Sequence, residues 1–166
     1  MTIEHLMTRD VETCEASDDL AHAAMIMWRR DCGIVPVVDP DDGRYAGVIT
    51  DRDICIAGAT KHRPLHTIPV REVMSRGIYT CAPGDNVLVA LHRMAEGQVR
   101  RLPVVSKDGR ILGILTLNDL ILAAERAERK RDDAVTYADV MSVLKAVSSH
   151  RLPTLVGTPG VIHSAA

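Results

Sequence analysis

Aromatic side chains are nearly missing from this chain of 166 residues, which has no phenylalanine, three tyrosines and one tryptophan, Trp28. Because 46 % of the residues are nevertheless apolar, a sizeable core is available, and it must be aliphatic. The length suits one domain or two tightly packed half-domains. We therefore expect a globular protein with a core of Val, Ile, Leu, Ala and Met.

An excess of either charge is also missing, since 20 Lys and Arg stand against 22 Asp and Glu. A nucleic-acid-binding surface would need a basic face or stripe, so we expect no nucleic-acid partner. No apolar run approaches the roughly 20 residues that span a bilayer. Residues 1–10 are polar and of mixed charge, unlike a signal peptide. The sequence thus predicts a cytoplasmic protein without a membrane partner.

The usual marks of catalysis and metal binding are missing as well. The chain has no GxSxG, P-loop or HExxH phrase, and no order of residues suggests a nucleophile with its base. Its cysteines lie far apart without a CxxC pair, which disfavours a zinc site or a disulfide framework. We expect reduced, buried thiols, no metal, no required cofactor and no enzymatic activity. The cysteines are Cys14, Cys32, Cys55 and Cys81.

What the chain does contain is an internal repeat. The matching pairs, 67 residues apart, include Met7 and Met74, Cys14 and Cys81, Asp18 and Asp85, Met27 and Met94, and Pro36 and Pro103. After a one-residue deletion, Gly47, Thr50 and Asp53 recur 66 residues later as Gly113, Thr116 and Asp119. Repeated supersecondary units bury their apolar faces against each other. Two copies therefore predict a pseudo-symmetric pair.

Each copy reads as β-α-β-β-α. A short turn (3–7; 70–74) and a brief strand (12–14; 79–81) precede an amphipathic helix with an acidic cap, Asp18-Asp19 in one copy and Asp85 in the other. An apolar run (34–38; 102–105), an Asp-Gly turn and a second strand (45–50; 110–116) predict a hairpin. A second helix (51–57; 117–130) closes each copy. The proline in each apolar run favours a strand edge or start.

The predicted organisation is a mixed α/β (α+β) fold of two repeats packed sheet to sheet, because one unit of about 50 residues is marginal alone. We place repeat 1 at 1–60, a linker rich in His, Pro and Thr at 61–69, and repeat 2 at 70–126. Helically spaced apolar residues from Tyr137 to Val147 predict a C-terminal helical extension at 127–153, after a solvated charge run. Residues 154–166, rich in Gly, Pro, Ser and Ala, are expected to be a flexible tail.

The second strand of each copy ends in Gly-x-x-Thr-x-x-Asp, at 47–53 and 113–119. This pattern presents a hydroxyl and a carboxylate at the start of a helix, where free backbone N–H groups attract anions. A carboxylate can accept hydrogen bonds from a ribose diol, and glycine allows another backbone or a flat base to approach. A nucleotide would satisfy all three groups. The alternative is a capping box, in which Thr and Asp serve only the helix start, although that motif prefers Glu or Gln.

This doubled phrase, with an apolar-Pro-Val strand upstream of each copy, closely resembles the CBS domain, the cystathionine β-synthase type, over about residues 1–124. The chain looks like a stand-alone bacterial CBS pair. The resemblance implies two clefts between the repeats that bind adenosyl ligands such as AMP, ADP, ATP or S-adenosylmethionine. Asp53 and Asp119 match the family's ribose-binding position. Thr50 and Thr116 match its hydroxyl that contacts the ribose or phosphate.

The copies differ before the proline, where Arg100 and Arg101 align with Gly33 and Ile34. In the family, basic residues here often reach a phosphate whose ribose is held by the other copy, so the resemblance implies a clamp in the Asp53 cleft. The Asp119 cleft would lack it and bind weakly, bind a less charged ligand or stay empty. Alternatively, both arginines only decorate a strand edge. The candidate site residues are Pro36, Thr50, Arg52, Asp53, Arg100, Arg101, Pro103, Thr116, Asn118 and Asp119.

Together these features predict a regulatory module that binds an adenosyl ligand and signals through its dimer geometry or a separate effector protein. The apolar stretches 54–59 and 120–124 are the expected surfaces of a homodimer. The alternative is a structural or interaction dimer whose clefts are vestigial.

Overall fold

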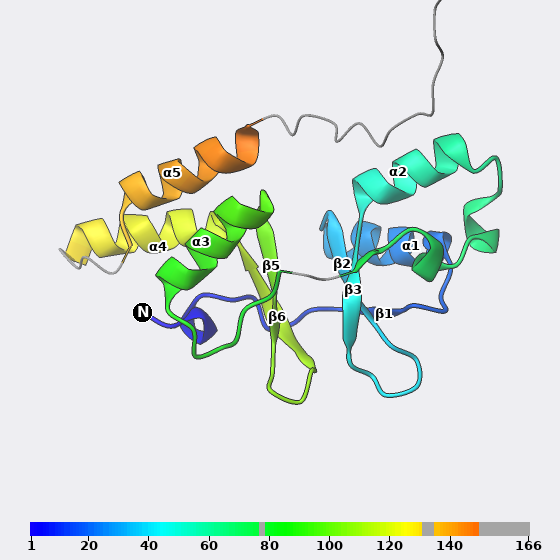
Figure 1. Cartoon of the computed structure of the whole chain (residues 1–166), viewed down its shortest axis with the longest axis horizontal. Coiled ribbons are helices and arrows are strands. Elements are labelled where there is room, and N and C mark those ends of the chain that lie inside the picture. Colours follow the sequence, from blue (N-terminus) through cyan, green and yellow to red (C-terminus); the bar gives the residue numbers. More distant parts are fainter. Residues whose placement is uncertain (77–78, 131–134, 150–166) are drawn as a thin grey trace, which may run out of the picture.

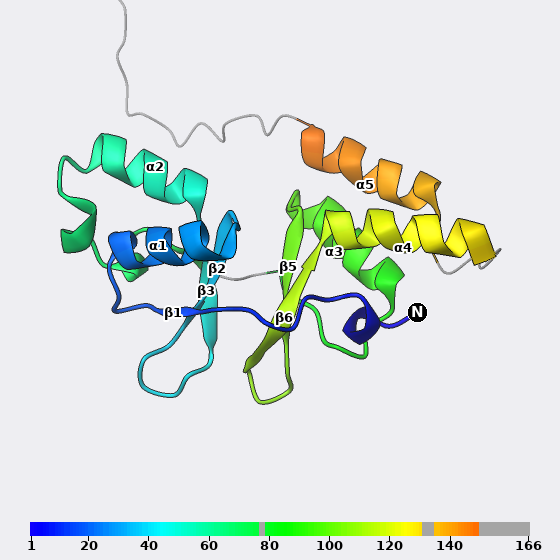
Figure 2. The same ribbon diagram turned by 180° about the vertical axis from the view of Figure 1, so that it is seen from behind.

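The computed structural model describes residues 1–76, 79–130 and 135–149. Two small sheets lie side by side in the middle of the molecule, with helices on their outer sides (Figures 1 and 2). The first part of the chain forms η1 (Ile3–His5), β1 (Cys14–Glu15), α1 (Leu20–Arg30), β2 (Ile34–Val38), β3 (Tyr45–Thr50), α2 (Asp51–Thr60) and η2 (Leu65–Thr67). The second part forms η3 (Val70–Glu72), β4 (Ser75–Arg76), α3 (Val87–Gly97), β5 (Arg101–Val105), β6 (Ile111–Thr116), α4 (Leu117–Lys130) and α5 (Tyr137–Ser148).

The predicted fold class and hairpins are confirmed. In each repeat the two central strands pair antiparallel, with a register shift at the same place, between Val37 and Val38 and between Val104 and Val105. The brief strand expected near 79–81 is reduced to a single parallel bridge between Cys81 and Val104, whereas its counterpart β1 pairs parallel with β2.

Each repeat completes the sheet of the other. β4 precedes α3 in the chain, yet it pairs with β3, with Ser75 opposite Val48. In the same way Thr8, which precedes β1, bridges Ile114 in β6. We call residues 8–12, which run from that bridge toward β1, the crossing segment (Figure 2). The two repeats are therefore interlocked by main-chain hydrogen bonds.

The glycine that opens each repeated phrase is explained by this exchange. A Cβ built on Gly113 would lie 2.5 Å from the carbonyl oxygen of Thr8, and one on Gly47 would lie 2.3 Å from the carbonyl oxygen of Ser75. Such distances are closer than any methyl group tolerates. The expected close approach is thus confirmed, and the group that approaches is the backbone of the other repeat.

The acidic helix cap is confirmed in the first repeat only. Asp19 caps α1 by accepting a hydrogen bond from the His22 backbone N–H (2.9 Å). In the second repeat the prediction is wrong by one residue, because Asn86 caps α3. Asp85 instead accepts from the Ala82 N–H (3.0 Å), as its counterpart Asp18 accepts from the Glu15 N–H (2.8 Å). Both carboxylates close the turn before the helix.

The strand-edge position expected for the prolines is wrong for Pro36, which lies in the middle of β2, an inner strand of the four-stranded sheet. The Pro103 carbonyl accepts from the Cys81 N–H (3.0 Å). Because the nitrogen and the carbonyl of one residue point to the same side of a strand, the Pro103 nitrogen, which has no hydrogen to donate, faces the segment around Cys81 and not β6. The register is equivalent in the first repeat, where β1 begins at Cys14, opposite Val37. No donor is needed at Pro36 because β1 begins only beyond it.

Two apolar clusters form the core, and each takes residues from both repeats. The first contains Leu20, Val35 and Ile49 together with Val70, which begins the second repeat. The second contains Met94, Leu102, Leu115 and Leu120 together with Ile3 and Met7. The amino-terminal turn therefore packs on the second repeat, and fully burying one such aliphatic side chain contributes about 1.5–3 kcal/mol.

The thiols divide between core and surface. Cys14 and Cys81 are each 2 % exposed, and burial raises the pKa of each thiol to about 12. The prediction of buried thiols is confirmed for these two, but it is wrong for Cys55, which is exposed on α2.

The predicted C-terminal helix is confirmed as α5, which packs on α3 and α4. The charge run continues α4 to Lys130, and the rest of that run and the expected tail (154–166) lie outside the described residues. Among the described helices, none is both long and apolar enough to span a bilayer.

Candidate functional site

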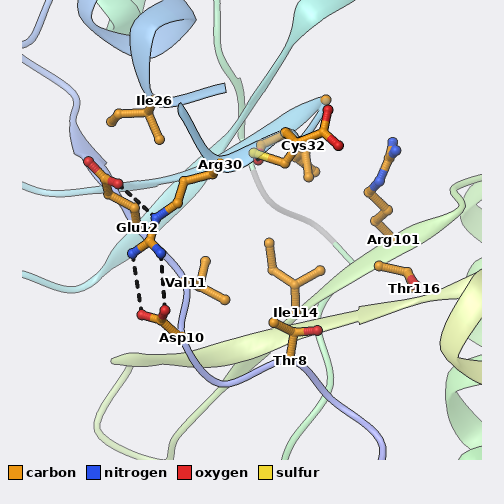
Figure 3. A pocket seen from close by; sticks show the side chains of 13 residues that line it. Thr8, Asp10, Val11, Glu12, Ile26, Arg30, Cys32, Arg101, Ile114 and Thr116 are labelled. Carbon is orange, nitrogen blue, oxygen red and sulfur yellow. Dashed lines mark hydrogen bonds and ion pairs between the residues drawn. The ribbon is translucent and has the colours of Figure 1, made fainter. Parts of the chain in front are cut away.

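A cavity of about 360 Å³ lies between the two repeats (Figure 3). Small-molecule sites commonly occupy about 300–1,000 Å³. The walls come from the crossing segment, from the end of α1 with the start of β2, and from the β5–β6 hairpin. The lining residues are Thr8, Asp10, Val11, Glu12, Ile26, Arg30, Asp31, Cys32, Gly33, Ile34, Arg101, Ile114 and Thr116.

One end of the cavity carries Arg101 and Thr116. These residues are register partners across β5 and β6, so their side chains stand next to each other on the same face. Gly33 lies close by, since a Cβ built on it would be 3.7 Å from an Nη atom of Arg101 and 3.0 Å from Oδ2 of Asp51. The missing side chain at Gly33 leaves room for the guanidinium at the edge of the cavity.

This placement corrects an expectation about the two clefts. Arg101 was expected to serve the Asp53 cleft, but it lines the cavity that contains Thr116, the hydroxyl of the Asp119 phrase. The cavity that holds the hydroxyl of the Asp119 phrase therefore has a basic residue in its lining, unlike the expectation for that cleft. The physical reason is the register, because Arg101 opens β5 directly opposite Thr116 of its own repeat.

A second arginine in the cavity is held by carboxylates. Arg30, the last residue of α1, donates to Asp10 (3.0 and 3.3 Å) and to Glu12 (2.9 Å) (Figure 3). Arg29 also pairs with Glu12 (2.6 Å). Hydrogen bonds from Arg30, first to Asp10 and then to Glu12, raise the pKa of its guanidinium above the usual value. These partly exposed pairs fasten α1 to the crossing segment, each with a small energy. Arg101 has no carboxylate partner in the described part of the chain.

The repeated Thr and Asp form capping boxes in both copies. Thr50 donates its hydroxyl to Oδ2 of Asp53 (2.7 Å), and the Asp53 N–H returns a bond to that hydroxyl oxygen (3.2 Å). Thr116 and Asp119 make the same two bonds with the same lengths. The Thr backbone N–H also donates to Oδ2 in each case (3.0 and 2.8 Å). The bonds of a capping box are thus present in both copies, and they use only Oδ2 of each carboxylate.

A third capping box shows what the motif does away from the cavity. Thr136 and Asp139 make the same bonds at the start of α5 (2.6 and 3.2 Å), and they lower the pKa of the Asp139 carboxyl. Thr-x-x-Asp alone therefore serves as an N-terminal helix cap. The two phrases between the repeats differ from it by the strand and the glycine that precede them.

The remaining candidates lie around the clefts rather than in the cavity lining. Pro36 and Pro103 are buried in their strands, whereas Arg52, Arg100 and Asn118 are exposed. The Arg100 carbonyl accepts the Leu117 N–H (2.9 Å), which joins the start of β5 to the start of α4. Thr50, Asp53 and Asp119 are also absent from the cavity lining.

Sequence reasoning missed the ion pair between Glu12 and Arg30. A signal was present, because their counterparts 67 residues on are Tyr79 and Gly97, and the two positions change together. A Cβ on Gly97 would lie 2.7 Å from the Tyr79 ring. One repeat thus has a charged pair where the other has a ring packed on a glycine.

A family model described as the CBS domain matches residues 3–59 and 70–126. The chain belongs to the CBS domain family. This CBS pair is 35 % identical over 127 residues to "Uncharacterized protein YlbB" of Bacillus subtilis, with 76 % of this chain and 84 % of that protein covered. It is 34 % identical over 119 residues to Hypoxic response protein 1 of Mycobacterium tuberculosis, covering 72 % and 82 % of the two chains.

Solved structures agree. The crystal structure of Hypoxic Response Protein I, with two coordinated zinc ions, has 33 % identity and a TM-score of 0.66, covering 74 % of this chain and 98 % of that one. The crystal structure of CBSX2 in complex with AMP has 25 % identity and a TM-score of 0.67, covering 77 % and 98 %. Within the described residues of this CBS pair, no group of three His, Cys, Asp or Glu side chains is placed to hold a metal ion.

Proposed function

We propose that this CBS pair is a non-enzymatic regulatory module that binds an adenosyl ligand in the cavity between its repeats. The observation that carries the proposal is the cavity itself, where an unpaired guanidinium and a hydroxyl stand beside apolar walls. Candidate ligands are AMP, ADP, ATP and S-adenosylmethionine. CBSX2 binds AMP in a fold of the same kind, which supports this class of ligand.

The proposed roles follow from the placement of each group. Arg101 carries the charge that a phosphate needs, and the Thr116 hydroxyl accepts from the ribose, or donates to the phosphate when it releases Asp119. Oδ1 of Asp119, which the capping box leaves unused, accepts from the ribose diol. Val11, Ile26 and Ile114 provide apolar surface for the base. In the opposite cleft, Thr50 and Asp53 play the equivalent parts.

The remaining candidates frame both clefts. Pro36 and Pro103 hold the strand backbone that borders the ligand, while Arg52, Arg100 and Asn118 stand at the rims as further contacts for charged groups. No cofactor is required for this function.

Calorimetric titration of the purified protein with AMP, ATP and S-adenosylmethionine tests the proposal. We expect binding of at least one ligand and its loss in Asp119→Ala. Asp139→Ala is the matched control, because it removes an equivalent capping box away from the cavity. Absence of heat with all three ligands, or equal effects of the two substitutions, would contradict the proposal.

For signalling we propose a homodimer in the bacterial cytoplasm. A ligand that contacts both repeats stabilises one arrangement of the pair, and the dimer geometry or an effector protein reads that arrangement. This requires the ligand to bind the two arrangements with different affinities.

The capping bonds favour one second candidate, a structural or interaction dimer with vestigial clefts. If Thr and Asp serve only the helices, the protein will associate in the same way with or without nucleotide. Sedimentation velocity with and without AMP, alongside the calorimetry, separates the two functions.

A further inference from the structure

The Arg101 side chain extends from the second repeat toward the first (Figure 3). A Cβ built on Gly33 would be 3.7 Å from an Nη atom of Arg101 and 3.0 Å from Oδ2 of Asp51. No ion pair joins the guanidinium to this carboxylate among the described residues. Both groups nevertheless lie near the same point, so their separation is shorter than the Debye length, about 8 Å at physiological ionic strength. Asp51 and Arg101 are thus opposite charges that face each other across the boundary between the repeats.

Asp51 is held in this position by the start of α2, of which it is the first residue. Its Oδ1 accepts the Arg52 backbone N–H (2.7 Å), and its own N–H donates to the Gly33 carbonyl (3.5 Å). Oδ2 accepts no hydrogen bond within the part of the chain that the structure describes. Because Gly33 has no side chain, nothing from that residue stands between the free oxygen and Arg101.

The two charges occur together in one repeat geometry and are both missing from the other. The counterparts of Asp51, Gly33 and Arg101 are, in the same order, Leu117, Arg100 and Ile34. The equivalence is structural too, because the Leu117 N–H donates to the Arg100 carbonyl (2.9 Å), the same main-chain bond as in the first repeat. Leu117 and Ile34 are 7 % and 8 % exposed. Two buried apolar side chains thus replace the carboxylate and the guanidinium, and the two positions change together.

We propose that Asp51 is a specificity-determining residue of the cavity, because its carboxylate competes with the phosphate of a bound ligand for Arg101. The inference rests on the adenosyl-binding function proposed above. Two anions that share one guanidinium repel each other, so each reduces the Coulomb energy that the other gains. Asp51 therefore lowers the affinity for a phosphate, and lowers it more as the ligand carries more negative charge. A nucleoside without a phosphate is unaffected.

The opposite wall of the cavity does not compensate for this competition. Arg30 is the other cation in the lining, and it already donates to Asp10 and Glu12. A phosphate that drew Arg30 away would leave those two carboxylates without this partner. The balance between Asp51 and Arg101 is therefore the part of the site that separates ligands by their charge.

Calorimetry at low ionic strength with adenosine, AMP and ATP tests the proposal. Asp51→Asn should tighten AMP binding by about twofold to fivefold, the range expected for exposed opposite charges, and ATP binding by a larger factor. Adenosine should bind equally to the variant and the parent protein. The gain should disappear near 1 M salt, where the Debye length is about 3 Å, and it should shrink in an Arg101→Ala background.

Asp41→Asn is the matched control, because it removes the same charge from the exposed turn between β2 and β3, outside the cavity lining. Equal effects of Asp51→Asn and Asp41→Asn on AMP would overturn the inference and leave adenosyl binding intact. An equal gain for adenosine and AMP would overturn it too, since the effect would then not act through the phosphate.

A measurement without ligand separates this inference from the proposed function. If the parent protein binds none of the three ligands, the proposed function fails, and urea denaturation at low salt tests the interaction between Asp51 and Arg101 directly. Asp51→Asn should lower the urea midpoint in any background, because a carboxylate stabilises the start of a helix. The loss should be larger in the parent protein than in Arg101→Ala. Equal losses would show that the two groups do not interact, and the inference would be wrong.

Discussion

Arg101 and Thr116 face each other across the β5–β6 hairpin, and both side chains line the cavity between the repeats. This pairing puts a fixed positive charge next to a hydroxyl in a partly apolar space. The nearest cation on the opposite wall, Arg30, is already held by Asp10 and Glu12. Arg101 should therefore determine the affinity of the cavity for a ligand with a phosphate group.

Replacing Arg101 by alanine should weaken AMP binding by about tenfold to a hundredfold, because hydrogen bonds to charged groups contribute about 1.5–3 kcal/mol. Adenosine, which has no phosphate, should bind the variant and the parent protein equally. Arg100→Ala is the control, since Arg100 is exposed and outside the cavity lining. Calorimetry with both ligands checks this, and an equal loss for AMP and adenosine would show that Arg101 does not act through the phosphate.

The strand glycines give a prediction about stability. Gly47→Ala and Gly113→Ala should each lower the free energy of unfolding by about 1–3 kcal/mol or more, because the new methyl group meets a carbonyl oxygen of the other repeat. Urea denaturation measures the change. Gly84→Ala is the control, because a Cβ at Gly84 meets nothing within 4 Å and its φ is not positive. Comparable destabilisation at all three positions would argue against the close approach.

Alkaline pH should destabilise the protein. Burial raises the pKa of Cys14, Cys81 and Tyr45 to about 12 each, above the values of the unfolded chain. Between about pH 9 and pH 12 the unfolded state loses these protons while the folded state keeps them, so unfolding becomes more favourable. Urea midpoints measured across this range should fall with pH.

The same burial gives a reactivity test with an internal control. In the native protein a thiol reagent at pH 8 should label exposed Cys55 quickly and leave Cys14 and Cys81 unmodified. All four thiols should react in urea. Replacing Cys14 by alanine should flatten the loss of stability at alkaline pH, whereas Cys55→Ala should leave it unchanged; fast native labelling of Cys14 would contradict the burial.

Much of the fold could be predicted because it depends on local rules applied twice. The helices, the hairpins and the turn glycines Gly43 and Gly109, with φ of +69° and +85°, follow from periodicity and turn chemistry. The cap at Asn86 was missed since Asp85 stands one residue earlier and makes a different, local bond. The exchange of strands could not be foreseen, because a pairing between Ser75 and Val48 leaves no periodic pattern in either segment.

The site was predictable in kind but not in detail. Of the residues predicted for the site, Thr116 and Arg101 line the cavity. Which cleft Arg101 serves depends on the β5–β6 register, which the sequence does not state. The wall formed by Asp10, Glu12 and Arg30 depends on the path of the crossing segment, so it appears only in three dimensions.

Because Thr8 pairs with β6 and Ser75 pairs with β3, a molecule with a single copy would lack one border of its sheet. It could regain that edge strand only by exchanging the residues before its first strand with a second molecule. Joining two copies in one polypeptide makes this strand exchange intramolecular. Dividing the protein after Thr60 would make it intermolecular again and leave two halves that need each other to fold.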